Sequence, residues 1–185
     1  MGSWWRRLYH EVYALGLQQA VALALCAGIL FCILDRRFGK RPGAKALWAG
    51  AWAAMAALIL TATVFSRQSG EGGLILRPFA AFAQARVQPE LYRELLMNML
   101  LFFPLGLAGA AALPERLRPG LRCVLAALAG VVLSLVVEGL QYRLSLGLAE
   151  TDDVLCNALG ALLGGGCLPL SRWLQRKTEQ SRPAG

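Results

Sequence analysis

Five apolar segments, each long enough to cross a lipid bilayer, alternate with shorter polar stretches along the chain. They occupy residues 12–34, 46–65, 95–113, 121–141 and 152–170. A membrane-spanning helix requires roughly 20 consecutive apolar residues, and each segment comes near this length. The pattern therefore predicts an all-α integral membrane protein, a bundle of about five transmembrane helices that forms a single domain over residues 1–185.

The longest connection, residues 67–93, is too polar and too short in its apolar parts to span a membrane. One helical face of this connection is apolar with a charged residue at its edge: Phe79, Phe82, Ala83 and Val87, beside Arg86. Pro78 and Pro89 bound this stretch, and proline is unfavourable inside a helix. We expect an interfacial helix here, lying in the headgroup layer of the membrane.

Composition supports the membrane class and indicates which kinds of partner to expect. Hydrophobic residues make up 57% of the chain and charged residues 16%, which is too apolar for the surface of a soluble domain. The net charge of +8 would suggest nucleic acid in a soluble protein. In a membrane protein, Lys and Arg at helix ends instead set the topology and contact anionic lipid headgroups. We therefore expect membrane lipids as partners and no nucleic acid.

The distribution of basic residues predicts the orientation of the chain across its membrane. The 35–45 and 114–122 loops and the C-terminal tail together carry 12 Lys and Arg, and the opposite side of the membrane carries 7. Because the cytoplasmic side is enriched in positive charge, the N-terminus is predicted to lie outside and the C-terminus in the cytoplasm.

Polar residues gather where three of the apolar segments meet one face of the membrane. Ser134, Glu138 and Gln141 follow helical spacing and share one face, as do Asp153 and Asn157. The polar residues expected at this one depth are Asn98, Glu138, Gln141, Asp152, Asp153 and Asn157. A carboxylate at mid-bilayer is unfavourable by roughly 2.5 to 3.5 kcal/mol, so a cluster of this kind predicts a functional site. On the charge count, the site lies in the outer leaflet.

Simpler explanations exist for most members of this cluster. Thr151 is suited to capping the N-terminus of the 152–170 helix, and the two aspartates would complement the helix dipole. Asn98 could cap its own helix, and Gln141 could be an interfacial amide. Glu138 is harder to explain in this way because it lies well inside an apolar run. The joint occurrence of these residues at one depth favours a site.

Glycine spacing in the last apolar segment predicts close helix packing. Gly160 and Gly164 form a GxxxG pattern, which lets two helix backbones approach each other. We expect this packing within the chain rather than in a dimer, and the oligomeric state is left open.

The polar cluster also carries a resemblance to a known family. Three elements occur in order: Asn98-x-x-x-Phe102-x-Pro104-x-Gly106, Glu138-x-x-Gln141 and Asp153-x-x-x-Asn157-x-x-Gly160-x-x-x-Gly164. Residues 74–170 resemble the VanZ-like family, although Ile75 and Gly147 stand where that family usually has Asn and Arg. The resemblance implies a bacterial multi-pass membrane protein related to teicoplanin resistance.

The first functional hypothesis is the binding or handling of an amphiphilic cell-envelope compound, such as a lipid, a cell-wall precursor or a lipoglycopeptide. Three arginines of the long connection could hold a phosphate or carboxylate, although each could equally contact lipid headgroups: Arg77, Arg86 and Arg93. The polar cluster would order the headgroup, and a groove between the last three helices would take acyl chains.

The alternative is a membrane-embedded enzyme acting on a lipid-linked substrate. An acid in an apolar setting, Glu138, favours its protonated form, whereas Asp153 at a helix N-terminus favours its ionised form. These two carboxyls could serve as acid and base, or as ligands for a divalent metal. No nucleophile-elbow, HExxH or phosphate-loop pattern occurs, and the sequence predicts neither a resident metal nor a cofactor.

A transporter is disfavoured because polar residues in the other halves of the helices are limited to Gln18 and Gln19.

Overall fold

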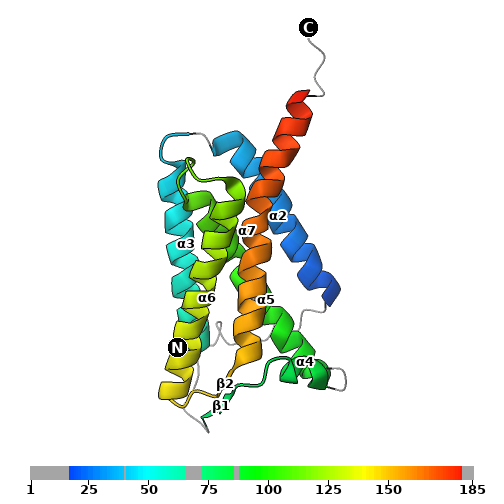
Figure 1. Cartoon of the computed structure of the whole chain (residues 1–185), viewed down its shortest axis with the longest axis vertical. Coiled ribbons are helices and arrows are strands. Elements are labelled where there is room, and N and C mark those ends of the chain that lie inside the picture. Colours follow the sequence, from blue (N-terminus) through cyan, green and yellow to red (C-terminus); the bar gives the residue numbers. More distant parts are fainter. Residues whose placement is uncertain (1–16, 40, 66–71, 86–87, 181–185) are drawn as a thin grey trace, which may run out of the picture.

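The computed structural model describes residues 17–39, 41–65, 72–85 and 88–180, and shows a bundle of long helices with a short β-ribbon at one end (Figure 1). Its elements are α2 (Leu17–Phe38), α3 (Ala44–Leu60), the π-helix η1 (Thr61–Phe65), β1 (Gly73–Ile75), α4 (Ala80–Gln84), α5 (Pro89–Ala112), α6 (Pro119–Arg143), β2 (Leu148–Glu150) and α7 (Thr151–Gln180). The predicted mostly helical architecture is therefore confirmed.

Four helices in the described ranges are long and apolar enough to cross a membrane. They are Ala44–Phe65, Glu90–Ala112, Pro119–Arg143 and Thr151–Thr178. These correspond to four of the five expected segments. The remaining one, 12–34, falls on α2 from residue 17 onward, and α2 packs against α5 and α7. That α2 forms a fifth span stays a prediction.

The central pair of the bundle is α5 and α7, whose backbones lie in direct contact. A side chain at Gly160 would overlap the carbonyl of Met99, and one at Gly164 would overlap the carbonyl of Phe103. Gly106 on α5 faces the backbone of Ala161 in the same way. The predicted GxxxG packing within the chain is confirmed, since these glycines let the two axes approach.

The outer faces of the helices are apolar, as expected for surfaces in contact with lipid. On α6, Leu128, Val132 and Leu135 are each more than half exposed. The same helix turns Ser134, Glu138 and Gln141 toward the interior of the bundle. This inside-out arrangement is the reverse of a soluble helix, and it agrees with a membrane setting.

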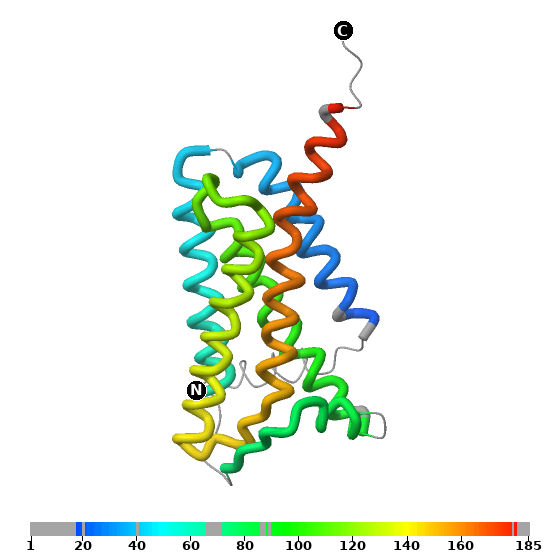
Figure 2. The backbone as a smooth tube through the Cα atoms, in the orientation of Figure 1, coloured from blue at the N-terminus to red at the C-terminus, as the bar shows by residue number. Residues whose placement is uncertain are grey.

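At one end of the bundle the chain forms a parallel two-stranded ribbon. Gly73, Leu74 and Ile75 pair in register with Leu148, Ala149 and Glu150. Figure 2 shows the chain continuing from β1 beneath the helices to α4. The expected interfacial helix is shorter here, because α4 has five residues and begins after Phe79, whose φ of 65° is left-handed. That α4 lies in the headgroup layer stays a prediction, and Arg86 and Val87 lie outside the described residues.

Of the helices in the described ranges, α5 and α7 extend furthest beyond the segments expected from the sequence. Helix α5 starts at Pro89 rather than at residue 95, since proline is favourable at the first helical position. Helix α7 continues through Pro169 to Gln180, well beyond residue 170. Pro169 has no backbone N–H to donate to the carbonyl of Gly165. Ser171 and Arg172, in the next turn, instead form hydrogen bonds to Asp35 of α2. Tertiary contacts therefore hold α7 together past its proline.

Candidate functional site

The polar residues expected at one membrane depth lie at the end of the bundle that carries the β-ribbon, low in Figure 1. They come from three helices: Asn98 from α5, Glu138 and Gln141 from α6, and the acids and Asn157 from the first turns of α7. The antiparallel course of α6 and α7 brings their polar turns together at the β2 connection. The structure therefore gathers these residues at one end, though in several separate contacts.

Glu138 is held beneath the ribbon. Its side chain is buried, with the residue 8% exposed, and its Oε2 accepts a hydrogen bond from the backbone N–H of Glu150 at 3.1 Å. Backbone amides stabilise a carboxylate without consuming a positive charge. The β2 strand thus fixes the orientation of the acid that lies deepest in the apolar run of α6.

Two amide side chains join α7 to its neighbours. Asn98 Nδ2 on α5 donates to Asp153 Oδ1 at 2.7 Å, and Asn157 Nδ2 donates to Ser134 Oγ on α6 at 2.9 Å. The carbonyl oxygen of Asn157 is buried and accepts no hydrogen bond within the described part of the chain. A buried acceptor left unsatisfied is unfavourable by about 1–3 kcal/mol, so this atom is available to a donor from water or a ligand.

Gln141 connects α6 to the π-helical end of the second span. Its Nε2 donates to the backbone carbonyl of Thr63 at 3.0 Å, while its Oε1 is buried with no partner among the residues described. Thr61 and Thr63 bond through their hydroxyls to carbonyls four residues earlier. Such back-bonding often bends helices. The Thr63 carbonyl lies in the last turn of η1, where helix carbonyls have no partner within the helix. Gln141 is therefore a buried structural contact rather than an amide at the surface.

Asp152 turns away from its neighbour and holds the loop that precedes α4. Its two carboxylate oxygens accept the backbone N–H groups of Phe79 and Ala81 at 2.5 and 2.7 Å, and the residue is 2% exposed. Thr151 donates to the carbonyl of Ile75 at 3.2 Å. Thr151 thus secures β1 rather than capping α7, and Asp152 serves the loop rather than the helix dipole alone.

Of the three arginines expected to hold a ligand, the structure describes two. Arg77 and Arg93 are exposed, and neither forms an ion pair or hydrogen bond within the described residues. Arg86 lies outside those residues. Arg77 and Arg93 therefore contact no carboxylate of the polar cluster within the described part of the chain. Their role in holding a ligand stays a prediction.

A groove of about 280 Å³ opens between α6, the start of α7 and the ribbon. Its walls are mainly apolar, and its polar groups come from Glu138, Glu150 and Thr151. The apolar walls include Leu74, Leu76, Leu135, Tyr142 and Val154. Sequence reasoning missed Glu150 and the two leucines of the 72–76 stretch, although the run Gly-Leu-Ile-Leu before Arg77 is a strand-like signal.

Glu150 occupies a strained electrostatic position. Burial raises the pKa of its carboxyl above the usual 4.5, and the negative charges of Glu94 and Asp152 raise it further. Within the ranges described, no three His, Cys, Asp or Glu side chains are grouped closely enough to hold a metal ion. The groove therefore offers hydrogen-bond acceptors and a proton-binding carboxyl rather than a metal centre built from these residues.

Long apolar helices with outward apolar faces, closed over buried acids and amides, define a multi-helix integral membrane protein. Within that class the sequence matches the family described as VanZ/LLP1 over residues 46–172. The chain belongs to this family, as its resemblance suggested. Searches of curated proteins and of solved structures found no significant match.

Proposed function

We propose that the protein binds an amphiphilic cell-envelope compound in the outer leaflet and thereby contributes to glycopeptide resistance. The compound is a lipid, a cell-wall precursor or a lipoglycopeptide such as teicoplanin. The single observation that carries the proposal is the groove beside Glu138, because it joins apolar walls to the buried Glu138 and the half-buried Glu150. An acyl or aryl group fits such walls, and the polar floor fits a headgroup.

The polar residues of the groove determine which headgroup it would bind. Carboxylates accept hydrogen bonds, so Glu138 and Glu150 favour a ligand with amine, amide or sugar hydroxyl donors near the apolar walls. Arg77 and Arg93 are exposed, and in this proposal they bind an anionic part of the same ligand outside the groove. The Asn98–Asp153 and Asn157–Ser134 hydrogen bonds hold the first turns of α7 against α5 and α6.

The test replaces Glu138 and measures both binding and resistance. Glu138→Gln should preserve folding, since an amide oxygen can still accept from the Glu150 N–H, but it removes the charge. Expressed in a glycopeptide-sensitive host, the wild type should raise the inhibitory concentration of teicoplanin and Glu138→Gln should not. Purified protein in nanodiscs should bind the compound about tenfold more weakly after this change, equivalent to about 1.4 kcal/mol.

Glu90→Gln is the matched control. Glu90 is an exposed acid in the first turn of α5 and does not line the groove, so its loss should leave resistance and binding unchanged. Equal activity of wild type and Glu138→Gln would contradict the proposed site. Turnover of a lipid-linked compound by the wild type, absent in Glu138→Gln and Asp153→Asn, would instead favour the enzyme alternative.

A further inference from the structure

A second pocket lies at the opposite end of the bundle from Glu138, between the N-terminus of α6 and the last part of α7. It has a volume of about 300 Å³ and is lined mainly by polar and charged side chains. The residues around it are Glu115, Leu117, Pro119, Arg122, Arg172, Gln175 and Arg176. Three of these are arginines and one is an acid, so the pocket is rich in positive charge.

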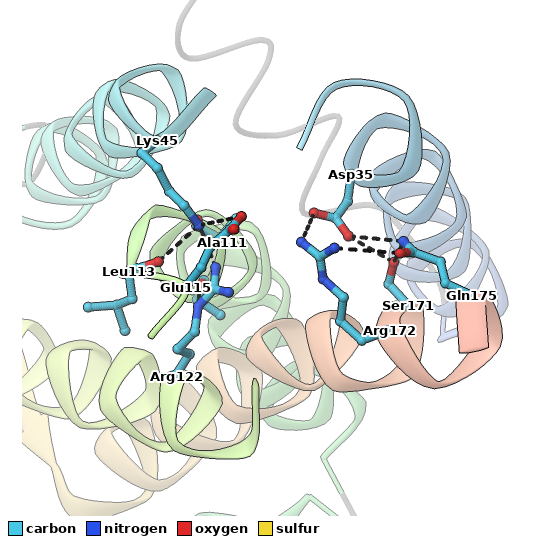
Figure 3. A network of polar contacts seen from close by, with 10 residues as sticks. Asp35, Lys45, Ala111, Leu113, Glu115, Arg122, Ser171, Arg172 and Gln175 are labelled. Carbon is cyan, nitrogen blue, oxygen red and sulfur yellow. Dashed lines mark hydrogen bonds and ion pairs between the residues drawn. The ribbon is translucent and has the colours of Figure 1, made fainter. Parts of the chain in front are cut away.

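The carboxylates near this pocket are already engaged. Glu115 lies 3.5 Å from the Lys45 ammonium, and Asp35 lies 3.1 Å from the guanidinium of Arg172. Figure 3 shows these as two separate networks that face each other, one around Lys45 and Arg122 and one around Asp35 and Arg172. No carboxylate of the described residues is within ion-pair distance of Arg122 or Arg176.

Arg122 is the informative residue because it is 3% exposed. Its Nε and Nη2 donate to the carbonyls of Ala110 and Ala111 at 2.9 and 3.0 Å, which caps the C-terminus of α5. Its Nη1 makes no hydrogen bond to the part of the chain that the structure describes. A buried guanidinium without a carboxylate is unfavourable unless an anion neutralises it.

The N-terminus of α6 adds to the same field. Arg118 precedes the helix without a side-chain cap, Pro119 occupies the first turn, and Leu117 and Pro119 line the pocket. The free N–H groups of a helix N-terminus carry a partial positive charge and attract anions. Arginine forks and a helix N-terminus are the two groups that recur in phosphate recognition.

We propose that this pocket binds an anionic phosphate group, held by Arg122, Arg172 and Arg176 at the α6 N-terminus. The phosphate belongs either to the headgroup of an anionic lipid or to a soluble phosphate. On the predicted orientation, this end of the bundle faces the cytoplasm, so the site is separate from the outer-leaflet site proposed above.

The experiment compares two sources of phosphate by measuring thermal unfolding and bound mass. The full chain is placed in nanodiscs of phosphatidylcholine, whose phosphate is offset by its own choline, or of phosphatidylcholine mixed with phosphatidylglycerol. Inorganic phosphate is titrated into the first set. Stabilisation and retained lipid only in the phosphatidylglycerol discs identify a lipid headgroup, whereas stabilisation by inorganic phosphate identifies a soluble ligand.

Arg176→Glu tests the pocket without disturbing the core, because Arg176 is exposed and makes no hydrogen bond in the described ranges. Its phosphate affinity should fall about tenfold or more, since one attractive charge becomes repulsive. Arg116→Glu is the matched control, because Arg116 is exposed in the connection between α5 and α6, at the same end of the bundle, but does not line the pocket. Its affinity should stay near that of the wild type.

Arg122→Lys is a second test variant, because lysine keeps the positive charge but lacks the planar guanidinium that binds phosphate through two N–H groups. It should also bind phosphate more weakly. The proposal is overturned if neither phosphate source stabilises the wild type. It is equally overturned if Arg116→Glu weakens binding as much as Arg176→Glu, because that result would indicate general surface charge.

Discussion

Adjacent acids perform different tasks in this protein. Asp152 and Asp153 are neighbours in the chain, and successive residues on a helix point about 100° apart, so one faces the α4 loop and the other faces Asn98. Sequence spacing placed both at the same membrane depth. It could not assign the partners, because the backbone N–H groups of Phe79 and Ala81 come from more than 70 residues earlier.

The first residue-scale prediction separates the two aspartates. Asp152→Ala should lower the free energy of unfolding by roughly 2–4 kcal/mol, because it leaves two backbone N–H groups without an acceptor. Asp153→Asn should change it by less than about 1 kcal/mol, because its amide oxygen still accepts from Asn98. Denaturant unfolding in detergent micelles measures both. Equal losses would contradict the separate roles of the two acids.

A pH dependence follows from Glu150. Its folded-state pKa lies above 4.5, so the folded protein binds this proton more tightly than the unfolded chain does. The stabilisation is fully present below about pH 4.5 and is lost as the pH rises through the raised folded pKa. Glu150→Gln has no such loss.

Unfolding measured between pH 4 and pH 8 tests this linkage by comparing the wild type with Glu150→Gln. The stability difference in favour of Glu150→Gln should widen as the pH rises and then level off above the folded pKa. A difference that stays constant with pH would show that the carboxyl titrates normally in the folded protein.

At the scale of elements, the contact between α5 and α7 depends on glycines that leave no room for side chains. Gly160→Ala should destabilise the bundle by roughly 1–3 kcal/mol, because the added Cβ overlaps the Met99 carbonyl and forces the helices apart. Gly166→Ala is the matched control on the same helix. Apart from the backbone of its own helix turn, nothing lies within 4 Å of its added Cβ, so the change should be neutral or stabilising. Thermal unfolding in micelles compares the two variants.

Hydropathy located the helices because lipid imposes a nearly uniform length on every span. The GxxxG contact was equally predictable, since glycine spacing reports close packing directly. The β-ribbon was not, because Gly73–Ile75 and Leu148–Glu150 are short and pair across a long separation. The extension of α7 past Pro169 was also missed, because it depends on contacts between Asp35 and the turn that follows the proline.

For the whole molecule, the remaining prediction is its orientation across the membrane. The basic residues favour a cytoplasmic side that contains the 35–45 loop, with the β2 connection outside. In a cysteine-free background, Leu148→Cys should react with an impermeant maleimide in intact cells. Lys40→Cys should react only after permeabilisation. The reverse labelling pattern would invert the molecule and exchange the sides of the two proposed sites.

The ribbon has a consequence for biogenesis. Strand β1 and the α4 loop leave the ribosome before α5 and α6, but their partners, β2 and Asp152, are synthesised only after both helices. A nascent chain therefore carries an unpaired strand edge and an unanchored loop until α7 begins to emerge. Insertion of the last helix completes this end of the protein. A chain truncated before residue 148 would retain its earlier spans but would lack the partners of β1 and of the α4 loop.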